Sequence, residues 1–243
     1  MDVFEPGFCL YDDPDLPEGG DADKWSPMLR DAHRRLWSKC LPSGECLELA
    51  ADLTMISPVA VRDLRLSSDT IATTHQRYQS ISNRGLWTAL STASQERYDR
   101  GFYTIGGFIV FPCHQQSLNQ RRGTCRQIND RFDLTLECIR LYYEGVTAIE
   151  RNPLGDVLLD DAAFFDLFGH GVHAFYSYVQ FFHLGDLVTN GQIRWFDSST
   201  VDEWHFADSP LPKDQAAYVS YLENVLKFVR SRSHALAQAL DRK

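Results

Sequence analysis

A loop between Cys113 and Arg131 gathers side chains that suit phosphate chemistry. The candidate residues are one histidine, one of its two asparagines and four arginines: His114, Asn119, Arg121, Arg122, Arg126 and Arg131. Guanidinium groups match the paired oxygens of phosphate, so the loop is a candidate phosphate- or nucleic-acid-binding site. A strand predicted before it and a helix predicted after it would hold these side chains near a helix start. The other interpretation is a solvated loop whose arginines pair with its own acids.

A second, weaker candidate lies near the end of the chain. Arg230 and His234 are four residues apart, so a helix places them on one face. Helical ribonucleases of toxin systems carry an arginine and a histidine on such a helix, but five residues apart. In this chain, the residue five positions before His234 is Val229 and not an arginine. The alternative interpretation is an exposed basic helix end, which the helix dipole favours.

A Gly-Gly pair interrupts the apolar run Tyr103–Pro112. A phosphate-binding P-loop ends in Gly-Lys-Ser/Thr, and a dinucleotide-binding turn needs G-x-G-x-x-G. Neither pattern occurs in this run. Gly106 and Gly107 therefore predict a bulge, a tight hairpin or a close backbone approach within a core strand.

The histidines and cysteines give little indication of a metal site. His170 and His173 could share a metal on a continuous helix, but Gly169 and Gly171 interrupt that helix. The six cysteines are Cys9, Cys40, Cys46, Cys113, Cys125 and Cys138. Because none forms a C-x-x-C pair, we expect reduced thiols, no metal and no cofactor, although the sequence leaves open whether His170 and His173 bind a metal.

The charge is concentrated at the beginning of the chain. Of 243 residues, 33 are acidic and 24 are basic, which gives a formal net charge of −9. Residues 1–24 hold eight acids and one base, so the remaining body is nearly neutral and unlike a globally basic nucleic-acid binder. With no signal sequence and no apolar stretch of membrane length, we expect a soluble, cytoplasmic protein without a membrane partner.

Helix signals dominate the rest of the chain. Ser26 and Pro27 predict a helix start, and residues 85–101 and 214–239 predict two further helices. Asn129 or Asp130 is expected to cap a helix that Gly145 ends. The apolar stretch 160–188 predicts helix with a break at Gly169 and Gly171. Short strands are expected at Ser67–Asp69, in the run that ends at Pro112, and at 191–196.

These elements predict an α+β fold, predominantly helical, with a small antiparallel sheet, in a single compact domain. Residues 25–243 form the globular domain. Residues 1–24 form an acidic, turn-rich segment packed on it or flanking it.

Several blocks of sequence occur together across nearly the whole chain. They include "YDDPD", "DADKWSPMLRDAHRRLWSKCLPSG", "LSSDTI", "YTIGGFIVFP", "INDRFDLTLECIRLYY", "FFDLFG" and "LVTNGQIRWF". The ensemble resembles a family of uncharacterised bacterial cytoplasmic proteins that is defined only as a domain of unknown function. The resemblance implies a single domain and carries no activity or catalytic residue with it.

Two functions follow from these features, and a third possibility is a small-ligand binder that uses the aromatic-rich region 164–182. The first is a non-catalytic binding or interaction protein, with the acidic segment and the 113–131 loop as its surfaces for a protein or nucleic-acid partner. The alternative is a nucleic-acid-directed enzyme or toxin, ribonuclease-like, in phage defence. Arginines clustered on one surface would favour the second function, whereas arginines held in ion pairs would favour the first. The sequence leaves the oligomeric state open.

Overall fold

The structure is a computed structural model. It describes residues 5–20, 22–42, 44, 48–49, 54–56, 64–72, 84–197, 206 and 211–241. Asp2 and Asp21 of the acidic segment, and Cys46, lie outside these ranges.

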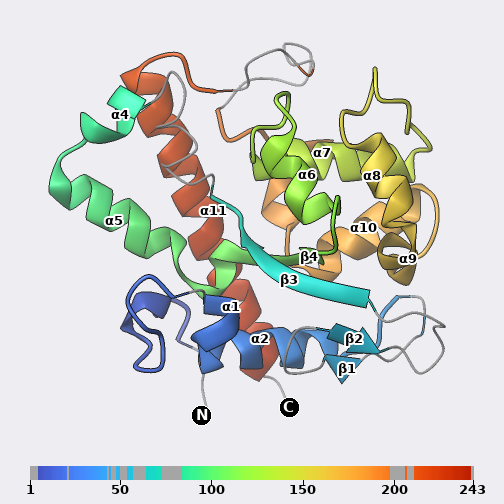
Figure 1. The fold of residues 1–243 in the computed structure, drawn as a ribbon, viewed down its shortest axis with the longest axis horizontal. Helices are drawn as coiled ribbons and strands as arrows, with labels where there is room; N and C mark the ends of the chain where they lie inside the picture. Colours follow the sequence, from blue (N-terminus) through green and yellow to red (C-terminus); the bar gives the residue numbers. More distant parts are fainter. Residues whose placement is uncertain are drawn as a thin grey trace.

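Helices make up most of the described chain (Figure 1). They are α1 (Ala22–Trp25), α2 (Pro27–Trp37), α4 (Arg84–Thr88), α5 (Thr92–Phe102), α6 (Leu118–Thr124), α7 (Phe132–Tyr143), α8 (Gly155–Asp160), α9 (Ala162–Phe165), α10 (Val172–Phe181) and α11 (Gln215–Asp241). The strands are β1 (Glu48–Leu49), β2 (Thr54–Ile56), β3 (Leu64–Thr70), β4 (Phe108–Pro112), β5 (Val188–Thr189) and β6 (Gln192–Ile193). The predicted fold class, α+β and predominantly helical with a small antiparallel sheet, is confirmed.

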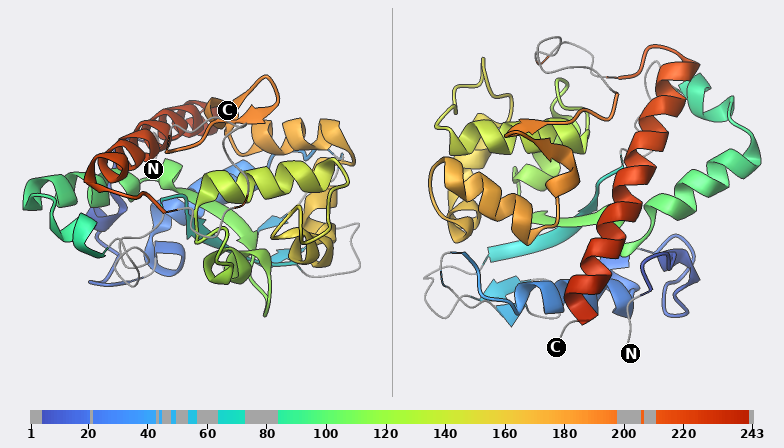
Figure 2. Two further views of the ribbon diagram at one scale, coloured as in Figure 1. Left: turned by 90° about the horizontal axis from the view of Figure 1, so that it is seen from above. Right: turned by 180° about the vertical axis from the view of Figure 1, so that it is seen from behind.

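The described strands form two antiparallel sheets. The first has the order β1-β2-β3-β4, and the second pairs β5 with β6. In the longest ladder, Leu66 of β3 lies opposite Pro112 of β4, and Thr70 lies opposite Phe108. The β3–β4 ribbon runs through the middle of the molecule, with α5 and α11 on one side and α6 to α10 on the other (Figures 1 and 2).

The longest helix, α11, crosses the molecule and organises the core. Its predicted stripe is buried, including Tyr218, Val225, Val229 and Leu236. Helix α5 packs along it, and the N-terminal segment lies near its C-terminal half (Figure 2). Buried residues from Leu10 to Leu240 belong to one hydrophobic cluster, which therefore joins both ends of the described chain.

Two local predictions at helix ends are confirmed. The Ser26 hydroxyl accepts a hydrogen bond from the Leu29 amide (3.2 Å), and Pro27 opens α2. The chain turns away after α7 at Gly145, whose φ of +80° suits glycine.

Two other local predictions are wrong in detail. Residues 85–101 form two helices, because Ser91 interrupts the helix and caps α5 by accepting a hydrogen bond from the Ser94 amide (3.2 Å). Neither Asn129 nor Asp130 caps α7. Both have left-handed backbones (φ +47° and +66°), and the N-cap position falls on Arg131.

The Gly-Gly pair makes a close backbone approach, one of its three predicted interpretations. Ile105–Gly107 form a 3-10 turn that leads into β4. The Gly106 amide donates to the Ser233 hydroxyl of α11 (3.0 Å), so the turn lies directly against this helix. All five residues of β4 are buried, so the strand belongs to the core as predicted.

Acid is expected to destabilise the protein through the buried histidine of α2. His33 bonds to the Ser68 hydroxyl (3.0 Å), and burial together with the charge of Arg232 lowers its pKa to about 3. The unfolded chain, with an ordinary histidine pKa of about 6.5, binds a proton below that pH and the folded chain does not. Urea unfolding at about pH 7.5 and 5.5 should show a loss of about 1.4 kcal/mol from His33 alone.

A matched pair of variants isolates this effect. In His33→Gln, the amide side chain can still bond to the Ser68 hydroxyl, but it does not bind a proton in this pH range. The free energy of unfolding of this variant should therefore change by about 1.4 kcal/mol less than that of the wild type between pH 7.5 and 5.5. His170→Gln changes a histidine whose side chain is 81% exposed and should retain the wild-type pH dependence. An equal pH dependence in all three proteins would exclude His33 as the cause.

Candidate anion-binding cleft

The predicted 113–131 loop is not a loop throughout, because helix α6 (Leu118–Thr124) lies within it, and the structure divides its arginines between interior and surface. Arg122 is fully buried, and its Nη1 contacts the carboxylates of Asp69 (2.5 Å) and Asp130 (3.4 Å). Its Nη2 donates to the Asp130 carbonyl (3.0 Å), and the guanidinium lies over the Phe111 ring. Arg122 therefore joins α6 to β3 and does not reach a surface ligand.

Arg131 has a similar interior position. Its exposed fraction is 1%, and its Nε and Nη2 donate to both carboxylate oxygens of Asp133 (3.1 and 2.5 Å). Its Nη1 pairs with Asp197 (2.8 Å), and the guanidinium lies over the Tyr221 ring of α11. This arginine links α7 to the region after β6 and to α11.

The remaining members of the loop set do not gather around one point. Asn119 donates to the Ser67 hydroxyl of β3 (2.8 Å). Arg126 is exposed and Arg121 partly so, and neither side chain has a hydrogen bond or ion pair with another described residue. Arg121 and Arg126 are thus the two arginines of this set whose side chains reach the surface.

The ring of His114 lies between two acceptors, which favour its protonated form. Its Nε2 bonds to the buried Asp161 carboxylate (2.6 Å), and its Nδ1 bonds to the Gln115 carbonyl (2.9 Å). Partial burial opposes the charge, but these acceptors outweigh burial and raise the pKa of His114 above its ordinary value. With both ring nitrogens donating, His114 has no free nitrogen to act as a general base.

The other histidine pair and the cysteines form no cluster. His170 is highly exposed and lies 3.3 Å from Asp166, and the chain breaks at Gly169 and Gly171 before α10 begins. Among the described residues, no group of three or more acidic, histidine or cysteine side chains is placed to hold a metal ion. The five described cysteines form no disulfide with one another.

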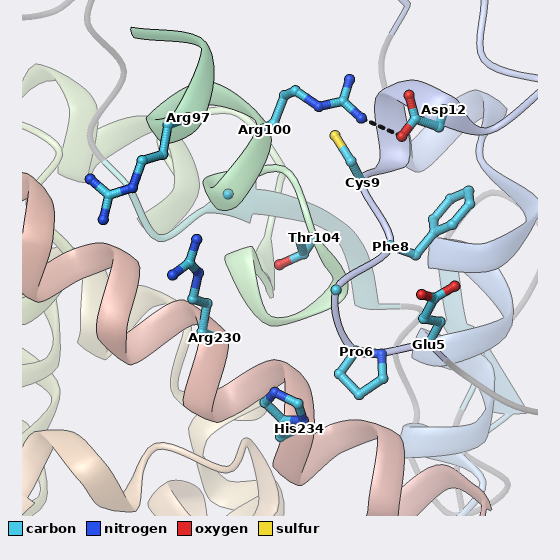
Figure 3. Close-up of a pocket in the computed structure, with 12 residues that line it drawn as sticks. Glu5, Pro6, Phe8, Cys9, Asp12, Arg97, Arg100, Thr104, Arg230 and His234 are labelled. Carbon is cyan, nitrogen blue, oxygen red and sulfur yellow. Dashed lines mark hydrogen bonds and ion pairs between the residues drawn. The ribbon is translucent and has the colours of Figure 1, made fainter. Parts of the chain in front are cut away.

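A cleft of about 690 Å³ opens where the N-terminal segment meets α5 and α11 (Figure 3). Three structural parts line it: the chain from Glu5 to Asp12, the C-terminal half of α5 with the following Thr104, and one face of α11. The polar and charged side chains around it are Glu5, Asp12, Arg97, Arg100, Thr104, Arg230 and His234. The weaker candidate pair of the sequence thus lies in a concave site.

The docking of α11 explains why Arg230 and His234 face the cleft. On one side of this helix, the Ser233 hydroxyl bonds to Thr104 (2.9 Å). Nearby, Arg232 donates to the carbonyls of Gly106 (2.7 Å) and Phe108 (2.6 Å). These bonds fix the helix rotation, so the adjacent face carries Arg230 and His234 outward, one turn apart. Figure 3 shows both side chains directed toward the N-terminal segment and α5.

Arg97 is a firmly held cation at the α5 wall. Its two terminal nitrogens donate to both oxygens of Glu223 on α11 (2.5 and 2.8 Å), and the Tyr98 hydroxyl donates to the same carboxylate (2.6 Å). These bonds lower the pKa of Glu223 to about 2. Three hydrogen bonds on one carboxylate therefore fix Arg97 and cancel its charge.

Arg100, one turn along α5, pairs with Asp12 across the cleft mouth (Figure 3). The segment that carries Asp12 is fastened independently of this ion pair. The Leu10 amide donates to the Tyr103 carbonyl (2.8 Å), and the Tyr11 ring stacks on Tyr103 with centroids 3.9 Å apart. The N-terminal segment is therefore one wall of the cleft.

The cleft has two exposed donor side chains that a ligand can reach, those of Arg230 and His234. Neither side chain forms a hydrogen bond or ion pair with another described residue, although the charge of Arg230 helps to lower the pKa of Glu223. The thiol of Cys9 also lines the cleft, but burial raises its pKa, so it stays protonated and is a poor nucleophile. This arrangement can attract and hold an anionic group.

The sequence did not indicate Arg97 and Arg100 as site residues. They are three apart on the predicted helix 85–101, and this spacing places them on one face. This spacing of two arginines was the signal in the sequence, and many surface helices show it without forming a site. Their position opposite Arg230 depends on the long-range packing of α5 against α11.

The fold and the cleft define a predominantly helical α+β protein with an arginine-lined cleft. The chain belongs to a family of unknown function (DUF6994), whose model matches residues 4–236. This match confirms the resemblance to a domain of unknown function across nearly the whole chain. No curated protein and no solved structure matches the chain. Within the described residues, no helix is long and apolar enough to cross a membrane.

Proposed function

We propose that this protein is a non-catalytic binding protein whose cleft holds the anionic group of a small ligand, a phosphate or carboxylate. The observation that carries the proposal is the position of Arg230 and His234. They lie one turn apart, face a cleft of about 690 Å³, and their side chains form no ion pair or hydrogen bond with another described residue. A guanidinium group and a neighbouring imidazole can donate hydrogen bonds to one phosphate.

The charge balance of the cleft supports a small ligand. Arg97 is neutralised by Glu223 and Arg100 by Asp12, and Glu5 adds a negative charge at the rim. Nucleic-acid surfaces instead present many uncompensated cations along a backbone path. The cleft volume lies in the range of small-molecule sites, about 300–1,000 Å³.

The chemistry of the lining supports binding without catalysis. The protonated Cys9 thiol is a weak nucleophile. His234 is not hydrogen-bonded to any described carboxylate or carbonyl that would fix its tautomer, whereas a catalytic histidine is usually oriented in this way. The groups that line the cleft are thus better suited to holding a charge than to moving a proton.

The alternative is a nucleic-acid-directed enzyme or toxin. It would use Arg121 and Arg126 of the loop, or Arg230 and His234. This alternative has less support than the binding function. Two of the four arginines of the loop, Arg122 and Arg131, have carboxylate partners in the interior. Arginines in ion pairs are the arrangement expected of a binding protein rather than of a basic nucleic-acid surface.

Replacing Arg230 by Gln is expected to weaken anion binding. Removal of a charge-assisted hydrogen-bond donor should raise the Kd for phosphate, pyrophosphate or AMP by about tenfold or more. Isothermal titration calorimetry at low salt measures this change. Arg126→Gln is the matched control, since Arg126 is an exposed arginine that does not line the cleft, and the variant should bind as the wild type does.

The same variants separate the two functions. Labelled single-stranded RNA and DNA at two salt concentrations provide the nucleic-acid arm of the experiment. Salt-sensitive binding that is lost in Arg126→Gln and kept in Arg230→Gln would favour the alternative. A small anion that binds the wild type and Arg230→Gln equally would contradict the proposed role of the cleft.

A further inference from the structure

We propose that Asp12 is a displaceable counter-ion that makes the cleft selective for ligands with two anionic groups. One group binds at Arg230 and His234, and the second takes Arg100 from Asp12. This inference rests on the proposed anion-binding function and names its ligand class: a small molecule with two separated phosphate or carboxylate groups.

The two ion pairs at the cleft differ in how firmly they are held. Glu223 receives both terminal nitrogens of Arg97 and the Tyr98 hydroxyl, and it lies on the long helix α11. Asp12 accepts a single hydrogen bond from Arg100. The two pairs are similarly exposed, with side-chain fractions of 44% and 51% for Arg100 and Asp12 and of 45% and 42% for Arg97 and Glu223, so water and salt screen both attractions. The number of hydrogen bonds distinguishes the pairs, and an incoming anion can compete more readily for Arg100, whose carboxylate partner accepts one bond, than for Arg97.

Release of Asp12 does not require the N-terminal segment to leave. Leu10 is fully buried and bonded to the Tyr103 carbonyl, and the Tyr11 ring is stacked on Tyr103. On the other side of Asp12, the buried Asp13 carboxylate accepts a hydrogen bond from the Ser26 hydroxyl (2.7 Å). Because the residues on both sides are anchored, only the Asp12 side chain has to turn toward solvent.

The positions of the two cations define the spacing between the anionic groups. Arg100 enters the cleft from α5, and Arg230 enters it from α11, with Thr104 between the two helices (Figure 3). A single phosphate on Arg230 leaves the Arg100–Asp12 pair intact. A second anionic group at the far end of a ligand reaches Arg100 and replaces the charge of Asp12, so the charge balance of that part of the cleft is preserved.

The test compares probes with one and two anionic groups. Methyl phosphate carries one, and 1,4-butanediol bisphosphate carries two that are separated. Calorimetry on the full chain should show tighter binding of the bisphosphate to the wild type. In Asp12→Asn, Arg100 is no longer paired with an acid, so the Kd of the bisphosphate should fall by about tenfold and that of methyl phosphate by less than about threefold.

Two further variants make the result specific. Asp15→Asn removes the same charge from the same segment, at an exposed position outside the cleft lining, and should leave the preference unchanged. Arg100→Gln should reduce the affinity for the bisphosphate to that for methyl phosphate. Thermal unfolding of each free variant verifies that it is folded.

The outcomes separate this inference from the proposed function. If Asp12→Asn and Asp15→Asn change bisphosphate binding equally, or if Arg100→Gln keeps the preference, Asp12 is not a counter-ion that the ligand displaces. In either case, binding that still depends on Arg230 leaves the proposed function standing. If neither probe binds the wild type, both the function and this inference are wrong.

Discussion

Replacing Asp133 by Asn is expected to lower the free energy of unfolding by about 3 kcal/mol. Asp133 is fully buried and neutralises Arg131 through both of its oxygens. The same carboxylate accepts hydrogen bonds from the backbone amides of Leu134 (3.1 Å) and Phe196 (2.9 Å). The amide side chain removes the charge that Arg131 requires, and loss of one partner from a buried pair typically costs about 3–5 kcal/mol. We expect a cost at the lower end of this range, because Asp197 still contacts Arg131 in the variant.

Chemical denaturation at neutral pH measures this change. The control is Asp31→Asn, which breaks an ion pair with Arg35 on the surface of α2, where both side chains are more than a third exposed. Exposed pairs of this kind contribute at most about 0.5 kcal/mol. Equal losses in the two variants would show that the buried pair does not stabilise the fold as described.

Replacing Gly106 by Ala is expected to lower the free energy of unfolding by about 3 kcal/mol, the upper part of the usual range for an overpacked position. A Cβ atom at this residue would lie 2.3 Å from the Ser233 hydroxyl oxygen, 2.4 Å from the Val229 carbonyl oxygen and 2.5 Å from the Ser233 amide nitrogen. Two of these atoms belong to the α11 backbone, which cannot move away as a flexible side chain does. The turn and the helix must therefore separate.

This substitution should also weaken anion binding, because the contact at Ser233 fixes the face of α11 that carries Arg230 and His234. Thermal and urea unfolding measure the stability, and calorimetry with pyrophosphate measures binding. Gly85→Ala is the control, since nothing lies within 4 Å of its added Cβ atom and alanine favours helix α4. A Gly106→Ala variant as stable as the control would contradict the close packing of the turn on α11.

Signals within a single turn of helix were sufficient to predict much of the fold. Ser26 and Pro27 determine where α2 begins because their preferences act locally, through a cap and a fixed backbone angle. The buried stripe of α11 follows from helical periodicity. The Asn129 and Asp130 prediction failed for the opposite reason: the chain there is left-handed, which both residues tolerate, and no sequence signal distinguished that role from capping.

The candidate site was less predictable because it depends on burial and on long-range packing. The sequence shows the charges of Arg122 and Arg131 but not the acids, such as Asp69 and Asp197, that pair with them inside. The sequence did predict that Arg230 and His234 lie on one face of a helix. Their position in one cleft with Arg100 and Asp12 depends on the packing of α5, α11 and the N-terminal segment, which the sequence does not show.

The most direct test of the anion-binding cleft is a titration of the ¹⁵N-labelled protein with pyrophosphate, followed by NMR through the arginine side-chain Nε–H signals. Arg230→Gln identifies the Arg230 signal by its absence, and Arg126→Gln identifies that of Arg126. We predict a saturable shift of the Arg230 signal, while the signals of Arg126 and the buried Arg122 stay in place. A saturable shift of Arg126 with an unmoved Arg230 would contradict the account.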